Sequence, residues 1–138
     1  MSANRELILA AYDAWNRRDL DAWLAACDPD VVIDLPGLFP DFEPEYRGHD
    51  GLRRFWEQLH EPWESFRIDV ESLEGDGDLF VADIRFRAKG AGSGANADMR
   101  YGQGFRLRDG RATLIVARGT PEEAARDLRV AEPARREA

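Results

Sequence analysis

The second half of the chain constrains the fold most, because apolar and charged residues alternate along its successive segments. An alternation with a period of two places alternate side chains on opposite faces of a β-strand. The clearest case is residues 79–90, LFVADIRFRAKG, in which Ala82, Ile84 and Phe86 share one face. Turn signals lie before this segment, at residues 75–78, and after it, at Asp109-Gly110, and the second is a strong signal for a two-residue hairpin. The pattern predicts an antiparallel sheet of consecutive hairpins.

The first third of the chain predicts helices, because apolar residues recur there at steps of three and four. The residues of this first stripe are Leu7, Ile8, Ala11, Tyr12, Ala14 and Trp15. Asp19 is the expected N-cap of a second helix, which Asp28-Pro29 ends before a short strand over Val31–Asp34. A third helix is expected over residues 50–60, and Thr120 is the expected N-cap of the last one.

The order of these elements predicts an α+β domain in which N-terminal helices pack on a strongly curved antiparallel sheet. Such a cone-shaped arrangement encloses a pocket between the helices and the sheet. Residues 36–48, PGLFPDFEPEYRG, contain three prolines and two glycines and predict a loop. We expect one domain over residues 1–130 and a disordered tail over residues 131–138.

The acidic composition limits the partners of the chain. With 27 acidic and 19 basic residues the formal charge is -8, which argues against nucleic acid and anionic membranes as partners. No apolar run approaches the roughly 20 residues of a membrane span, and the N-terminus lacks a signal-peptide pattern, so we expect a cytoplasmic protein. Cys27 is the only cysteine, and His49 and His60 form no spacing motif. We therefore expect no disulfide, metal or cofactor site.

The last hairpin predicts a polar group of the pocket. A two-residue turn at Asp109-Gly110 sets Tyr101 opposite Arg118 and Gln103 opposite Val116, on a face with apolar neighbours. If that face is concave, then Tyr101, Gln103 and Arg118 hold a carbonyl, hydroxyl or carboxylate group of a ligand. The alternative is that the three side chains satisfy one another, with Arg118 reaching solvent at the end of its strand.

Aromatic residues of the helices and of the loop are expected to form the pocket wall. The expected wall residues are Tyr12, Trp15, Phe39, Phe42, Trp56 and Trp63. Phe39 and Phe42 lie beside prolines in the loop, which predicts a lid over an apolar ligand. The alternative, an ordinary core residue, applies more to Trp56 than to Phe39 or Phe42.

The other face of the last hairpin is small and flat, since Gly102 and Gly104 lie there beside Ile115 and Ala117. We expect a partner subunit's sheet to cover this outer face in a homodimer. The alternative is that Ile115 is a single exposed apolar residue. Farther out, four charged residues predict a solvent-exposed ladder of cross-strand pairs: Asp83, Arg85, Asp98 and Arg100.

The end of the first strand leaves open which side chain faces the pocket. Alternation places Val31, Ile33 and Leu35 on one face and Val32 and Asp34 on the other. A carboxylate in an apolar pocket would have a raised pKa and could serve as a general base. A solvated aspartate at a strand end is the alternative.

Three stretches carry a resemblance to a known family: AYDAWNRRDLDAWLAACDPDVVIDLPG, YRGHDGLRRFWEQL and FRLRDG. Over roughly residues 5–125 the chain resembles the SnoaL-like branch of the nuclear transport factor 2-like superfamily. The resemblance implies a cone-shaped α+β fold, often dimeric, with a pocket between the sheet and the N-terminal helices. That superfamily includes ketosteroid isomerases, polyketide cyclases, dehydratases, epoxide hydrolases and non-catalytic binding domains, so the fold does not decide the chemistry.

In ketosteroid isomerases an aspartate at the end of the first strand, a tyrosine and a second aspartic acid act on a ketone. The matching positions here fall on Leu35, Ala11 and Gln103, with Asp34 and Tyr12 each one residue away. We therefore favour a domain that binds a small apolar molecule bearing oxygen, with Leu35 in place of the base. The alternative is a cofactor-free isomerase, cyclase or lyase with Asp34 as general base.

Overall fold

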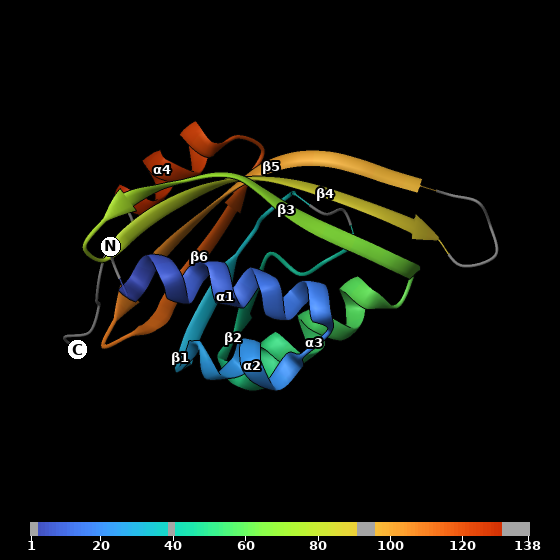
Figure 1. Cartoon of the computed structure of the whole chain (residues 1–138), viewed down its shortest axis with the longest axis horizontal. Coiled ribbons are helices and arrows are strands. Elements are labelled where there is room, and N and C mark those ends of the chain that lie inside the picture. Colours follow the sequence, from blue (N-terminus) through green and yellow to red (C-terminus); the bar gives the residue numbers. More distant parts are fainter. Residues whose placement is uncertain (1–2, 39–40, 91–95, 131–138) are drawn as a thin grey trace.

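Figure 1 shows the computed structural model, which describes residues 3–38, 41–90 and 96–130. Three helices, α1 (Ala3–Arg17), α2 (Leu20–Ala25) and α3 (Gly48–His60), lie on one side of a curled sheet, and α4 (Pro121–Val130) lies on the other. The strands are β1 (Cys27–Asp34), β2 (Glu45–Arg47), β3 (Trp63–Asp76), β4 (Leu79–Gly90), β5 (Asn96–Arg108) and β6 (Arg111–Arg118). The predicted α+β fold, with N-terminal helices on a curved sheet, is confirmed. The tail 131–138 and Phe39 lie outside the described residues.

The sheet is open and has six strands in the order β2-β1-β6-β5-β4-β3. From β3 to β6 the strands form the antiparallel hairpins that the alternation predicted. The first strand differs from the prediction, because β1 pairs in parallel with β6 and the sheet is mixed. Its other neighbour is β2, a three-residue strand inside the segment that we predicted to be a loop. Proline and glycine flank this strand and hide it in the sequence.

Side-chain caps begin two of the helices where the sequence predicted them. The backbone N–H of Ala22 donates to the carboxylate of Asp19 at 3.0 Å, and that of Glu123 donates to the hydroxyl of Thr120 at 3.1 Å. Each cap satisfies a donor that the helix itself leaves unpaired. The caps fix where α2 and α4 start, and therefore how each meets the sheet.

Polar side chains attach α1 to β3, the strand at one edge of the sheet. Asn16 donates to the carbonyl of Ile68 at 2.9 Å and accepts from its N–H at 2.8 Å, as a neighbouring strand would. Nearer the start of α1, the guanidinium of Arg5 donates to the carbonyl of Leu73 at 2.6 Å. These bonds satisfy backbone groups at the sheet edge, and they hold α1 with Tyr12 and Trp15 buried.

The pairing of β5 with β6 differs from the prediction because the hairpin contains a β-bulge. The turn at Asp109-Gly110 has positive φ at both residues, and Leu107 pairs with Ala112, as a two-residue turn there requires. The register then shifts between Arg106 and Leu107, so that Arg106 pairs with Leu114. A shift of one residue moves every later side chain of a strand to the other face.

The consequence is that Arg118 lies opposite Gly102, and Gln103 lies opposite Ala117. The predicted pairs of Tyr101 with Arg118 and of Gln103 with Val116 are therefore wrong. The turn dipeptide fixes the register only up to the bulge.

Helix α4 covers the outer face that we predicted to be a dimer interface. A Cβ atom on Gly102 would lie 2.5 Å from Cα of Pro121, and one on Gly104 would lie 3.2 Å from Leu128. The small residues therefore make room for the chain's own helix, and that prediction of the interface is corrected. The formation of a homodimer stays a prediction. Ile115 is buried, so it is not a single exposed residue either.

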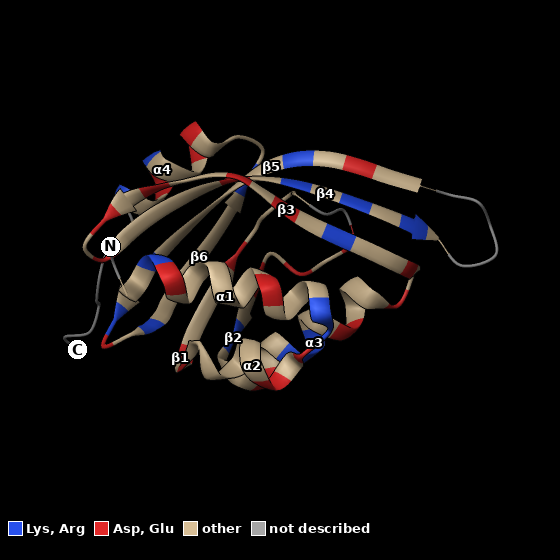
Figure 2. Cartoon of the chain, viewed as in Figure 1, with Lys and Arg blue, Asp and Glu red and all other residues tan. Residues whose placement is uncertain are grey.

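Farther along β4 and β5 the outer face carries charges of both signs (Figure 2). Arg85 pairs with Asp98 at 2.8 Å, and Arg100 pairs with Asp83 at 3.0 Å, between side chains that are 25–59% exposed. The predicted ladder is confirmed, and each such pair contributes little to stability. Among the helices of the described ranges, none is long and apolar enough to cross a membrane.

Candidate functional site

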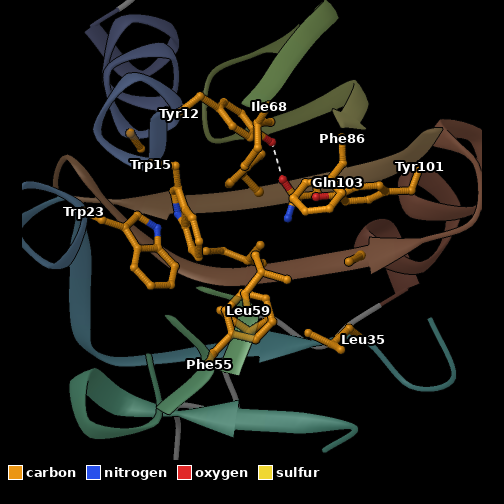
Figure 3. Close-up of a pocket in the computed structure, with 15 residues that line it drawn as sticks. Tyr12, Trp15, Trp23, Leu35, Phe55, Leu59, Ile68, Phe86, Tyr101 and Gln103 are labelled. Atoms are coloured by element: carbon orange, nitrogen blue, oxygen red, sulfur yellow. Dashed lines mark hydrogen bonds between the residues drawn. The ribbon is translucent and has the colours of Figure 1, made fainter. Parts of the chain in front are cut away.

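A cavity lies between the concave face of the sheet and helices α1, α2 and α3 (Figure 3). Its volume is about 40 Å³, room for roughly one or two water molecules. Aromatic and aliphatic side chains dominate the wall. The lining residues are Ala11, Tyr12, Trp15, Trp23, Ile33, Leu35, Phe55, Leu59, Ile68, Phe86, Tyr101, Gln103, Phe105, Ile115 and Ala117.

The polar groups of the wall gather where α1 meets β5. The hydroxyl of Tyr12 donates a hydrogen bond to Oε1 of Gln103, and Tyr101 projects from the same strand beside them (Figure 3). Because the amide oxygen accepts from Tyr12, the amide nitrogen of Gln103 is directed away from that hydroxyl. This nitrogen has no hydrogen-bond partner among the described residues. The cavity therefore offers an N–H donor to whatever occupies it.

Both tyrosines of the wall are neutral hydrogen-bonding groups. Burial raises the pKa of Tyr12 well above its ordinary value, and the neighbouring Tyr101 raises it further. Burial likewise raises the pKa of Tyr101. A low-dielectric surrounding disfavours the phenolate, so neither side chain serves as a base near neutral pH.

The end of β1 presents Leu35, not Asp34, to the cavity. Ile33 and Leu35 line it, so the alternation places Asp34 on the opposite face of the strand. There the carboxylate of Asp34 pairs with Arg118 at 3.3 Å, and its side chain is 37% exposed. The same guanidinium donates to the carboxylate of Asp127 in α4 at 2.7 Å. Asp34 and Arg118 thus join β1, β6 and α4 outside the cavity.

The predicted aromatic wall is only partly assembled at the cavity. Trp56 is buried against Trp15 and Trp23, in the core position that was its alternative. Trp63 packs on Phe86 with ring centroids 6.3 Å apart, and it does not line the cavity. Phe42 packs on Phe55, with centroids 5.6 Å apart. The lining residues predicted from the sequence are Tyr12, Trp15, Leu35, Tyr101 and Gln103.

The SnoaL-like domain family matches residues 8–115, most of the described chain. The chain belongs to the SnoaL-like domain family. This result confirms the resemblance that the sequence predicted. None of the curated protein sequences matches the chain significantly.

Solved structures place this SnoaL-like domain within the NTF2-like fold. An NTF2-like protein of unknown function from Burkholderia pseudomallei K96243 is 25% identical, with a TM-score of 0.78 over 91% of this chain and 97% of that chain. TerC, co-crystallised with polyporic acid, is 23% identical, with a TM-score of 0.77 over 94% and 100% of the two chains. RV0760c from Mycobacterium tuberculosis, in complex with estradiol-17beta-hemisuccinate, is 16% identical, with a TM-score of 0.72 over 85% and 93%.

The sequence missed most of the apolar lining of the SnoaL-like domain, although one signal was present. Phe105 shares the face of Tyr101 and Gln103, and Phe86 shares that of Ala82 and Ile84, so alternation alone pointed both into the concave side. The missed residues from the helices and the short strand face inward for the same periodic reason. These are Trp23, Ile33, Phe55 and Leu59.

No group of three or more histidine, cysteine or acidic side chains within the described ranges could hold a metal ion. His49 contacts the carbonyl of Cys27 through Nε2 at 3.0 Å. Burial raises the pKa of the Cys27 thiol to about 12, with a smaller contribution from Asp28. A thiol with such a pKa stays protonated and unreactive at neutral pH.

Proposed function

We propose that this SnoaL-like domain binds a small, mainly apolar ring compound that carries an oxygen able to accept a hydrogen bond. The observation that supports the proposal is the aromatic cavity, in which the polar groups of the wall meet at Tyr12 and Gln103. Apolar walls with a few placed polar groups are typical of small-molecule sites. Of the structures with the same fold, TerC was co-crystallised with polyporic acid, and RV0760c was solved in complex with estradiol-17beta-hemisuccinate.

The polarity of the ligand follows from the bond between Tyr12 and Gln103. The amide oxygen of Gln103 already accepts the hydroxyl proton of Tyr12, so the amide N–H of Gln103 remains to bind the ligand. A carbonyl oxygen is a suitable acceptor for this N–H. Such a bond adds roughly 0.5–1.5 kcal/mol net to the binding free energy. The remaining affinity comes from apolar area removed from water, at about 25 cal/mol per Å².

The cavity is small, so side chains of its wall must move before a ligand can enter. Its volume of about 40 Å³ is well below the roughly 300 Å³ of an ordinary ligand pocket. A ligand with one or two rings therefore enters only if wall side chains rotate. We expect small flat molecules to bind more readily than large ones, because each displaced side chain adds to the cost.

Binding is better supported than proton-transfer catalysis. The described lining contains no carboxylate and no imidazole, and its tyrosines stay protonated. Asp34 was the base of the alternative hypothesis, and its carboxylate lies on the face turned away from the cavity, beside Arg118. We therefore do not favour a cofactor-free isomerase, cyclase or lyase that depends on Asp34.

The test uses 1-tetralone, a bicyclic aromatic ketone, and tetralin, the matching hydrocarbon, in calorimetric titrations of the purified protein. We expect tetralone to bind more tightly, and Gln103→Leu to weaken its binding about 2- to 12-fold without affecting tetralin. The matched control is Gln58→Leu, which removes a second Tyr–Gln hydrogen bond, to Tyr46, away from the cavity. Failure of both probes to bind, or equal affinity for both, refutes the proposal.

Two earlier expectations accompany this proposal as predictions. A cytoplasmic location follows from the sequence pattern, and a homodimer follows from the family resemblance. Size-exclusion chromatography with light scattering tests the homodimer, and a single species at the mass of one chain excludes it.

A further inference from the structure

His60 carries an atom whose hydrogen bonding is incomplete. Among the side-chain nitrogens and oxygens of the described ranges that are fully inaccessible to solvent, its Nε2 is the one that lacks a hydrogen-bond partner. The other ring nitrogen, Nδ1, lies 2.8 Å from the carbonyl oxygen of Trp56, one helical turn earlier in α3. Since a carbonyl only accepts, Nδ1 bears the proton, and Nε2 of the neutral ring is a bare acceptor. Protonation would turn Nε2 into a buried donor without an acceptor.

The ring of His60 supports the cavity wall from behind. It is parallel to the indole of Trp15, with an interplanar angle of 6° and centroids 5.7 Å apart. Trp56 and Phe66 enclose it at centroid distances of 4.5 and 4.7 Å. Trp15 itself lines the cavity, so His60 contacts a side chain of the cavity wall.

The charges around His60 favour its neutral form. Arg18, at the end of α1, lies over the ring of Phe66 at 5.6 Å and donates to the carbonyl of Glu64. The acidic side chains of the flanking segments, Glu57, Glu61 and Glu64, are exposed. Burial lowers the pKa of His60, the bond to Trp56 partly offsets this, and Arg18 lowers it further.

We propose that neutral His60 positions Trp15 in the cavity wall, so that protonation of His60 loosens the wall and weakens ligand binding. The statement about binding rests on the proposed function, whereas the statement about Trp15 does not. His60 is a positioning residue, because it acts on the ligand only through Trp15. Acidification then lowers affinity without changing the protonation of any group that touches the ligand.

The experiment measures the Kd of 1-tetralone between pH 7.5 and 5. For the natural chain we expect Kd to be constant near neutral pH and to rise toward about tenfold per pH unit once His60 protonates. His60→Phe keeps an aromatic ring against Trp15 and cannot titrate, so its Kd stays constant over the range. His60→Ala removes the ring and weakens binding at every pH. The control His49→Gln alters the other histidine and keeps the natural pH profile.

A second readout separates this inference from the proposed function. In the protein without ligand, the indole N–H resonance of Trp15 should follow the titration of His60, and should not do so in His60→Phe. If tetralone fails to bind but Trp15 follows His60, the proposed function is wrong and the positioning role stands. If Trp15 does not follow His60, or if His60→Phe keeps the pH profile of Kd, the inference is refuted.

Discussion

Replacement of Gly102 by alanine tests the contact between α4 and the outer face of the sheet. The new Cβ atom would lie 2.5 Å from both Cα and N of Pro121, where ordinary contacts begin at 3.4 Å. Both opposing atoms belong to the backbone, so no side-chain rotation relieves the overlap. Either the start of α4 shifts by roughly 1 Å while the helix stays docked, or the helix leaves the sheet.

The structure indicates which response costs less. Undocking would expose Leu128, Val116 and Ala124, each at most 1% exposed now, and would cost about 4–6 kcal/mol of apolar burial. Overpacking with a small backbone shift costs about 1–3 kcal/mol. We therefore expect Gly102→Ala to lower the free energy of unfolding by about 2–3 kcal/mol with α4 still docked. For a chain of this length that loss lowers Tm by about 7–10 °C.

Thermal and urea unfolding followed by circular dichroism measure the change. The matched control is Gly119→Ala, whose Cβ would meet only the flexible carboxylate of Glu123, at 3.3 Å. We expect the control to change the free energy of unfolding by less than about 0.5 kcal/mol. If Gly102→Ala is as stable as the control, then α4 does not cover Gly102 and the outer face is free after all.

Three further predictions concern the cavity and the ion pairs around Arg118. Ala117→Val adds two methyl groups to the cavity wall and fills part of the cavity. We expect an unchanged or higher Tm and at least about tenfold weaker binding of tetralone. Undiminished binding of tetralone would show that the cavity is not the binding site. Asp34→Asn should change tetralone affinity less than about twofold and stability by at most about 1 kcal/mol; a large loss of affinity would return Asp34 to the site. Hydrogen bonds from Arg118, and to a smaller extent from Arg126, hold the pKa of Asp127 below 3.8. The ionised carboxylate of Asp127 therefore stabilises the folded chain above about pH 4, and this stabilisation is lost as pH falls through the lowered pKa. Asp127→Asn should therefore flatten the dependence of stability on pH between about 2 and 4, and an unchanged slope refutes the pairing.

Local patterns in the sequence predicted the elements that depend on local physics. The caps at Asp19 and Thr120 depend only on residues within one helical turn, and both are confirmed. The third helix, expected over residues 50–60, is confirmed as α3, and the helical spacing of its apolar residues buries Leu52 and Leu59. The hairpin at Asp109-Gly110 likewise follows from two residues that tolerate positive φ.

Long-range geometry decided what the sequence did not show. One extra residue in β6 placed Arg118 on the outer face, and nothing in the turn signals such a bulge. Which face of β1 is inward depends on the strand's partner β6, so Leu35 and Asp34 could not be distinguished locally. The covering of Gly102 depends on where α4 docks after the chain turns. These are tertiary choices, and the candidate site was therefore predicted less completely than the fold.

The place of β6 between β1 and β5 has a consequence for biosynthesis. In the described sheet, β6 joins the pair β2-β1 to the series β5-β4-β3, and Ile115 lies beside Ile33 from the distant start of the chain. A nascent chain therefore exposes the apolar residues of β1 until nearly all of the domain has left the ribosome. Such late, non-local pairing slows folding and prolongs the period in which chains can aggregate. The domain acquires its cavity only when its last strand arrives.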